Sequence, residues 1–202
     1  KNMHFFFFFS IDKRNNKAFL NGLLVSVDPR VDLSIVQRTI SKGYQSINGN
    51  AFTENTFPTN ETGIYAGVSI RPAIGWKIDA YADFYKFPWL KFLVDAPSYG
   101  KDFLAQVTFT PNRQVEIYTR FKTETKQANQ SDNTTVTNFL VNLPKQNWRT
   151  QISYKLNTSF TIRNRVELLW FDNNGVNKAN GFLTFFDFMY KPMLKPLAAV
   201  LR

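Results

Sequence analysis

The stretch that decides the fold is GIYAGVSIRPAIGWKIDAYADFY, residues 63–85. From Gly63 to Ile70, and again from Trp76 to Tyr85, small or apolar side chains alternate with polar or charged ones. Because successive side chains of a strand point to opposite faces of a sheet, this period of two predicts two strands with one apolar and one polar face each. Residues 71–75 contain Pro and Gly, which predicts the tight turn that joins the two strands.

The same pattern recurs along the whole chain. It predicts about eleven strands, with expected ranges of 3–11, 17–27, 31–42, 63–71, 76–86, 102–110, 114–125, 148–156, 159–171, 181–191 and 197–202. Most of these ranges exceed the usual strand length of about 5–6 residues. They match the roughly 9–11 residues that a tilted strand needs to cross a bilayer.

The connections between these strands alternate in length. Short turns are expected at 27–30, 71–75, 111–113, 157–158 and 192–196. Longer loops are expected at 43–62, 87–101, 126–147 and 172–180, and residues 12–16 are intermediate. Short turns on one side and long loops on the other are typical of a barrel in a bacterial outer membrane.

The polar rows of the strands carry full charges, which cost several kcal/mol each when buried without partners. We therefore expect these residues to face a water-filled or polar lumen: Lys77, Asp79, Asp83, Glu116, Arg120, Lys122, Arg149, Lys155, Arg163, Arg165 and Glu167. The opposite rows are expected to face lipid: Ile64, Val68, Ile78, Val115, Ile117, Phe121, Ile152, Ile162, Val166 and Leu168. Trp76, Trp89, Trp148 and Trp170 lie near expected strand ends, where aromatic girdles meet the membrane interface.

The bulk composition is compatible with this interpretation. The chain has 202 residues and is 44% hydrophobic, enough for one domain spanning residues 1–202. No continuous apolar run approaches the roughly 18 residues of a membrane helix, and the absence of cysteine excludes disulfides and thiolate metal sites. The net charge of +10 could attract a polyanion, but no basic tract supports this, and charges spread along a wet face explain it better.

Catalytic signatures are mostly missing. His4 is the only histidine, and neither a phosphate-binding loop nor a GxSxG motif occurs. Asp79 and Asp83 would lie about 13 Å apart along one strand, farther than the roughly 5–9.5 Å of a glycosidase pair. A pair formed across strands, such as Asp83 with Glu116, stays open. We expect no enzyme activity, cofactor or metal.

The two ends of the sequence look like strand interiors. Residues 5–9 are all Phe, with no small-residue cleavage site after them, and residues 197–202 are mainly apolar. We therefore expect a fragment of a larger barrel, truncated at both ends.

Several segments carry a family resemblance: Arg38–Ser46, Gly49–Asn55, Arg71-Pro72, Trp76–Leu90 and Val94–Pro97. They resemble a large family of Bacteroidota outer-membrane proteins, usually labelled helix-hairpin-helix domain-containing proteins. The resemblance covers nearly all of the chain. It implies a periplasmic helix-hairpin-helix segment, absent from these residues, joined to a C-terminal barrel. Its motifs carry no known chemistry, so no catalytic residue is transferred.

Together these observations predict an all-β, antiparallel, up-and-down transmembrane β-barrel of a bacterial outer membrane. The expected role is non-enzymatic: porin-like, a scaffold or a subunit of a membrane complex. Expected partners are membrane lipid, lipopolysaccharide and other outer-membrane subunits or lipoproteins. Two alternatives stay open. One is a soluble β-sandwich or jelly roll that binds or degrades an acidic polysaccharide, and the other is a barrel for the passage of nucleic acid.

Overall fold

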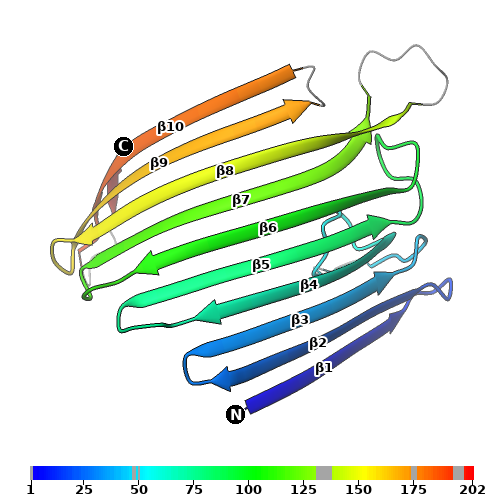
Figure 1. Ribbon diagram of the computed structural model, residues 1–202, viewed down its shortest axis with the longest axis horizontal. Helices are drawn as coiled ribbons and strands as arrows, with labels where there is room; N and C mark the ends of the chain where they lie inside the picture. The colour runs from blue at the N-terminus through cyan, green and yellow to red at the C-terminus, as the bar shows by residue number, and fades with distance from the viewer. Residues whose placement is uncertain (1, 47–48, 50, 131–137, 174–176, 193–197) are drawn as a thin grey trace.

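The computed structural model describes residues 2–46, 49, 51–130, 138–173, 177–192 and 198–202. These residues form a single antiparallel sheet whose spatial order follows the sequence from β1 to β11 (Figure 1). The strands are β1 (Asn2–Ile11), β2 (Lys17–Asp28), β3 (Val31–Ile40), β4 (Glu61–Ile70), β5 (Trp76–Phe87), β6 (Ser98–Phe109), β7 (Val115–Asn129), β8 (Leu140–Lys155), β9 (Phe160–Asn173), β10 (Asn177–Tyr190) and β11 (Ala199–Leu201). Within the described residues, no helix has the length and apolar character needed to span a membrane.

The prediction of an all-β, up-and-down architecture is confirmed, but the sheet is open. Among the described residues, β1 pairs with β2, β11 pairs with β10, and these two outer strands do not pair with each other. Closure into a barrel therefore stays a prediction. The sandwich alternative requires a second sheet to cover the apolar rows, whereas the described strands all belong to one curved sheet (Figure 1).

A glycine with positive φ and two asparagine side chains shape the turns at the short-loop end. In the β4–β5 turn Gly75 has φ +80°, and a Cβ atom there would lie 2.7 Å from the carbonyl oxygen of Thr110. Thr110 N donates to Gly75 O at 2.7 Å, which joins this turn to the next one. In the later turns, Asn112 Oδ1 and Asn157 Oδ1 each accept two backbone N–H groups just downstream. These Asx turns start β7 and β9.

Two loop expectations need correction. The described residues of the long loop expected at 126–147 are mostly strand, because the β7–β8 ladder continues from Lys126↔Leu143 to Asn129↔Leu140. Trp148 therefore lies in the middle of β8 and not near its end. The described residues of the loop expected at 172–180 also belong to strands, since β9 ends at Asn173 and β10 begins at Asn177. Residues 193–196 of the expected turn lie outside the described residues.

The strand register separates the two sets of side chains. The residues expected to face water all lie on one face, as the rung Asp79–Gln106–Arg120–Arg149–Glu167 illustrates. We call this the charged face. The residues expected to face lipid lie on the opposite, apolar face, together with Trp76, Trp148 and Trp170.

Burial is inverted relative to a water-soluble sheet. The largest fully buried side chains are Arg38, Phe87, Glu61 and Asp187. Large apolar side chains on the apolar face are exposed, including Phe7, Ile64, Phe121, Ile152 and Phe186. The small buried core lies on the charged face at the long-loop end, where Tyr85 and Phe87 of β5 pack against each other at 5.6 Å between ring centres. This core positions the site described next.

Candidate polar site on the charged face

The charged face is divided into an acidic half and a basic half. Strands β3–β6 present two cations, Arg38 and Lys77, against five carboxylates: Asp32, Glu61, Asp79, Asp83 and Asp102. Strands β7–β9 present eight cations against three carboxylates. The cations are Arg120, Lys122, Lys126, Lys145, Arg149, Lys155, Arg163 and Arg165, and the carboxylates are Glu116, Glu124 and Glu167. The positive charge of this face is therefore concentrated on β7–β9.

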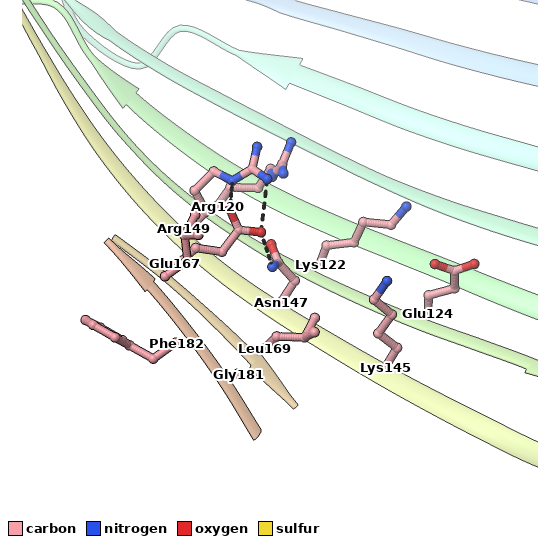
Figure 2. A pocket seen from close by; sticks show the side chains of 11 residues that line it. Arg120, Lys122, Glu124, Lys145, Asn147, Arg149, Glu167, Leu169, Gly181 and Phe182 are labelled. Atoms are coloured by element: carbon pink, nitrogen blue, oxygen red, sulfur yellow. Dashed lines mark hydrogen bonds and ion pairs between the residues drawn. The ribbon is translucent and has the colours of Figure 1, made fainter. Parts of the chain in front are cut away.

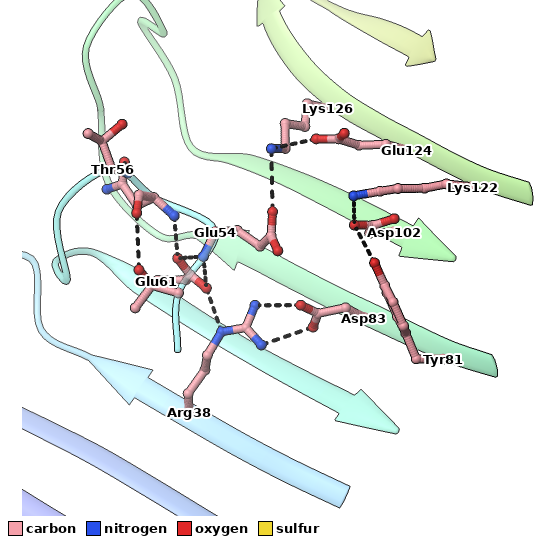
Figure 3. Close-up of polar contacts among 12 residues, drawn as sticks. Arg38, Glu54, Thr56, Glu61, Tyr81, Asp83, Asp102, Lys122, Glu124 and Lys126 are labelled. Atoms are coloured by element: carbon pink, nitrogen blue, oxygen red, sulfur yellow. Dashed lines mark hydrogen bonds and ion pairs between the residues drawn. The ribbon is translucent and has the colours of Figure 1, made fainter. Parts of the chain in front are cut away.

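A buried ion cluster occupies the acidic half at the long-loop end (Figure 3). Arg38 of β3 donates through Nε to Glu61 Oε1 at 2.5 Å, and through its two terminal nitrogens to both oxygens of Asp83 at 2.9 and 3.0 Å. The three side chains are no more than 3% exposed. Gly63 of β4 makes the contact between β3 and β5 possible, because a Cβ atom there would lie 2.7 Å from Arg38 Cζ.

The loop between β3 and β4 folds over this cluster (Figure 3). Glu61 accepts hydrogen bonds from Glu54 N at 2.9 Å and Asn55 N at 3.0 Å. The Phe52 ring lies 5.2 Å from Arg38 Cζ, within cation–π range. Glu54 reaches across the face to Lys126 of β7 at 3.4 Å. The loop thus links the acidic half to the basic half.

The β5–β6 loop is fastened to its neighbours on both sides. Trp89 N donates to Asn60 Oδ1 at 2.9 Å, and the Lys42 ammonium lies 3.7 Å from the centre of the Trp89 ring. Trp89, expected to be an interface aromatic, is therefore a loop residue that contacts another loop. At the other end Asn138 Nδ2 donates to Asp95 Oδ2 at 2.7 Å. Hydrogen bonds from Asn138 and Asn129 hold the pKa of Asp95 below its ordinary value.

Lys91 in the same loop carries its ammonium 3.7 Å from the centre of the Phe87 ring. Burial lowers the pKa of Lys91, and the nearby positive charge of Lys126 adds to this effect. The loop thus brings a partly desolvated cation onto the small apolar core.

A second network crosses the boundary between the halves. Asp102 of β6 accepts from Tyr81 OH at 3.2 Å and pairs with Lys122 Nζ at 2.7 Å. Lys126 pairs with Glu124 at 2.5 Å on the same strand. Among the described residues, Asp102 Oδ1 is buried without a hydrogen-bond partner.

The basic half contains a cavity of about 470 Å³ between β7 and β10 (Figure 2). Arg149 donates to Glu167 through two nitrogens at 2.7 and 3.0 Å, and Asn147 donates to the same carboxylate at 2.6 Å. Arg120 lies directly opposite Arg149 in the β7–β8 ladder. Leu169 and Leu183 add apolar surface, while Gly181 leaves space beside them.

The expected site residues are only partly brought together. Asp83 joins the ion cluster, while Arg120, Lys122, Arg149 and Glu167 line the cavity. The pair Asp83 and Glu116 is not brought together. Asp83 shares a rung with Glu124, eight residues or about 26 Å along β7 from Glu116.

Sequence reasoning missed the buried partners Arg38, Glu61 and Asp102 as site residues. The sequence offered only a weak sign of this cluster: Gly63 stands at the start of the alternating pattern, two residues after the carboxylate Glu61. Only the cross-strand register shows that this glycine makes room for an arginine side chain.

Among the described residues, no group of three or more His, Asp or Glu side chains could hold a metal ion. Comparison of the chain with family models, curated proteins and solved structures finds no match. The arrangement of its own residues is therefore the basis for assigning a function.

Proposed function

We propose that this chain forms the wall of an outer-membrane β-barrel, with the apolar face toward lipid and the charged face toward the lumen. One observation carries the proposal: Arg38, Glu61 and Asp187 are fully buried, while large apolar side chains of the opposite face are exposed. In water, exposed apolar area costs about 25 cal/mol per Å². In a bilayer the same area is favourable, and the charges remain in a polar interior.

Strand length and loop placement support the same conclusion. Strands β2 and β4–β10 run from 10 to 16 residues, enough to span a hydrocarbon core at a tilt of about 45°. The described residues of the loops 41–60 and 88–97 lie at the same end of the sheet. The short turns 29–30 and 71–75 lie at the opposite end (Figure 1). In bacterial barrels these ends face the exterior and the periplasm, respectively.

The role that we propose is non-enzymatic and porin-like, with a scaffold or complex-subunit role as the alternative within the same class. The loop over the ion cluster supports the porin-like role, because Phe52 and Glu54 lie over the charged face and would narrow a closed lumen. Lipid, lipopolysaccharide and other outer-membrane subunits are the proposed partners. The resemblance to the Bacteroidota family is consistent with this proposal.

The proposal is tested by accessibility in lipid. The chain contains no cysteine, so single-cysteine variants of the full chain can be labelled without background. Ile117→Cys and Val166→Cys report on the apolar face, while Glu116→Cys and Arg165→Cys are matched neighbours on the charged face. In reconstituted vesicles a water-soluble maleimide should label the second pair and not the first.

Two results would contradict the proposal. One is fast labelling of Ile117→Cys and Val166→Cys in folded protein in vesicles. The other is a full chain that stays folded and monodisperse in buffer without detergent.

A further inference from the structure

We propose that the cavity between β7 and β10 is a binding site for a small organic anion that carries phosphate or carboxylate groups. The cavity is lined by four cations, Arg120, Lys122, Lys145 and Arg149, and by two carboxylates, Glu124 and Glu167. Its side chains come from consecutive strands, so the site is built into the sheet and not onto a mobile loop (Figure 2).

Arg120 is the residue that points to a ligand. It lies directly opposite Arg149, and like charges in that position are destabilising. Glu167, the carboxylate next along this rung, is already occupied by Arg149 and Asn147. Among the described residues, the Arg120 Nε is buried without a hydrogen-bond partner, and no ion pair joins its guanidinium to a carboxylate. An anion bound beside Arg120 would pair with this guanidinium.

The other carboxylates near the cavity are also occupied. Glu124 pairs with Lys126 at 2.5 Å, and Asp102 of the adjoining strand pairs with Lys122 at 2.7 Å. Rearranging either pair to satisfy Arg120 would break an existing contact. An external anion would satisfy Arg120 without that loss.

The shape and chemistry of the cavity define the class of ligand. Its volume of about 470 Å³ falls within the range of about 300–1,000 Å³ for small-molecule sites. Guanidinium groups bind carboxylate and phosphate oxygens through two parallel hydrogen bonds. Leu169 and Leu183 offer apolar contact beside the cations. These features fit a solute with one or more acidic groups on a small carbon skeleton.

Binding at this site is a property of the folded chain and can be measured without a membrane. Its use for selecting anionic solutes rests on the proposed function, because only a lumen would carry solutes past the cavity. The experiment therefore measures binding to the purified full chain in detergent, apart from any transport.

Isothermal titration with inorganic phosphate and with citrate, at fixed ionic strength, tests the site. We expect saturable binding of at least one of the two probes, and the tighter probe identifies the acidic group preferred. Arg120→Gln should weaken that binding by about tenfold or more, since a charge-assisted hydrogen bond contributes about 1.5–3 kcal/mol. Arg120→Lys, which keeps the charge but loses the planar fork, should fall between Arg120→Gln and the parent chain.

Two further variants separate a built site from general charge attraction. Lys155→Gln removes one exposed positive charge from the same face outside the cavity, and it should leave binding unchanged. Gly181→Leu keeps every charge but fills the cavity, and a Cβ atom at this position meets Leu169 Cβ at an ordinary 3.4 Å. It should abolish binding while the protein stays folded.

The inference is overturned if neither probe saturates, or if chloride binds as tightly as both probes. It is also overturned if Lys155→Gln weakens binding as much as Arg120→Gln does. Binding that survives in Gly181→Leu would place the anion elsewhere and overturn it too. Loss of binding in this variant supports the site even if Arg120→Gln fails to fold. Labelling of the apolar face tests the proposed function separately, so the two failures are distinguishable.

Discussion

Replacing Asp83 with Asn should be among the most destabilising charge changes on the charged face. Asp83 accepts two hydrogen bonds from Arg38, at 2.9 and 3.0 Å, and both side chains are at most 3% exposed. Asn has the same shape but no charge, and only its carbonyl oxygen can accept. The positive charge of Arg38 would then face Glu61 alone.

The size of the loss in unfolding free energy follows from the burial of Asp83 and Arg38. Removing one partner of a buried ion pair typically costs about 3–5 kcal/mol, because the remaining charge is left without full compensation. Asp79→Asn is a matched control on the same strand and face. Its pair with Lys77 has a similar distance, 2.9 Å, but its side chains are 47% and 30% exposed. Exposed pairs contribute about 0–1 kcal/mol.

The assay is denaturant unfolding of the full chain in detergent or vesicles, followed by fluorescence of its four tryptophans. We expect the loss in the free energy of unfolding to be several times larger for Asp83→Asn than for Asp79→Asn. Adding Arg38→Met to Asp83→Asn should cost less than the sum of the two single changes, because the two residues interact. Equal losses for the two Asn variants would refute the burial argument.

Three further predictions concern a turn, the apolar face and a loop. Gly75→Ala should lower the free energy of unfolding by about 1–2 kcal/mol, because φ is +80° and the new Cβ would meet a carbonyl oxygen at 2.7 Å. Gly181→Ala, where the new Cβ makes an ordinary 3.4 Å contact, should leave the free energy of unfolding nearly unchanged in the same assay. Ile117→Arg should lower the free energy of unfolding in vesicles by about 2–4 kcal/mol, the value for a position near the midplane of the bilayer. Arg120→Ile should lower it less. A larger loss for Arg120→Ile than for Ile117→Arg would contradict the proposed orientation of the two faces. Hydrogen bonds lower the pKa of Asp95 below 3.8, so their stabilising contribution is complete above about pH 3.8 and is lost as the pH falls through the lowered pKa. An NMR titration of the carboxyl group should show this low midpoint, and an ordinary midpoint would mean that the loop contact is absent in solution.

The alternation of side chains was sufficient to predict the faces of the sheet. Asp79, Arg120 and Glu167 were expected on one side, and the register places them on one rung. This works because the period of two is a local property of an extended backbone. The count of strands and their order followed from the same signal.

The ends of β7 and β8 could not be predicted in this way. From Gln127 to Asn129 and from Leu140 to Lys145 polar residues and a proline interrupt the alternation. Backbone hydrogen bonds in the ladder, which carry no side-chain signature, extend these strands. The midstrand position of Trp148 is a direct consequence, since its expected place near a strand end depended on the loop boundary.

The segregation of charge was also hidden from the sequence. Several strands carry charges of both signs on this face, as Lys77 and Asp79 of β5 show. The acidic and basic halves appear only when strands β3 to β9 are set side by side. The contact of Arg38 with Asp83 skips β4 entirely and depends on the absence of a side chain at Gly63. Such a contact joins residues 45 positions apart in the sequence.

The ion cluster of Arg38, Glu61 and Asp83 also ties loop docking to strand register. Its members come from three successive strands, so all three charges can meet only after both hairpins have formed. The contact of Glu61 with Arg38 requires only the β3–β4 ladder, whereas Asp83 joins the cluster when β5 pairs with β4. Docking of Glu54 and Asn55 onto Glu61 therefore depends on correct registration of β3 with β4. A register slip of a single residue would turn Arg38 to the opposite face and leave this loop undocked.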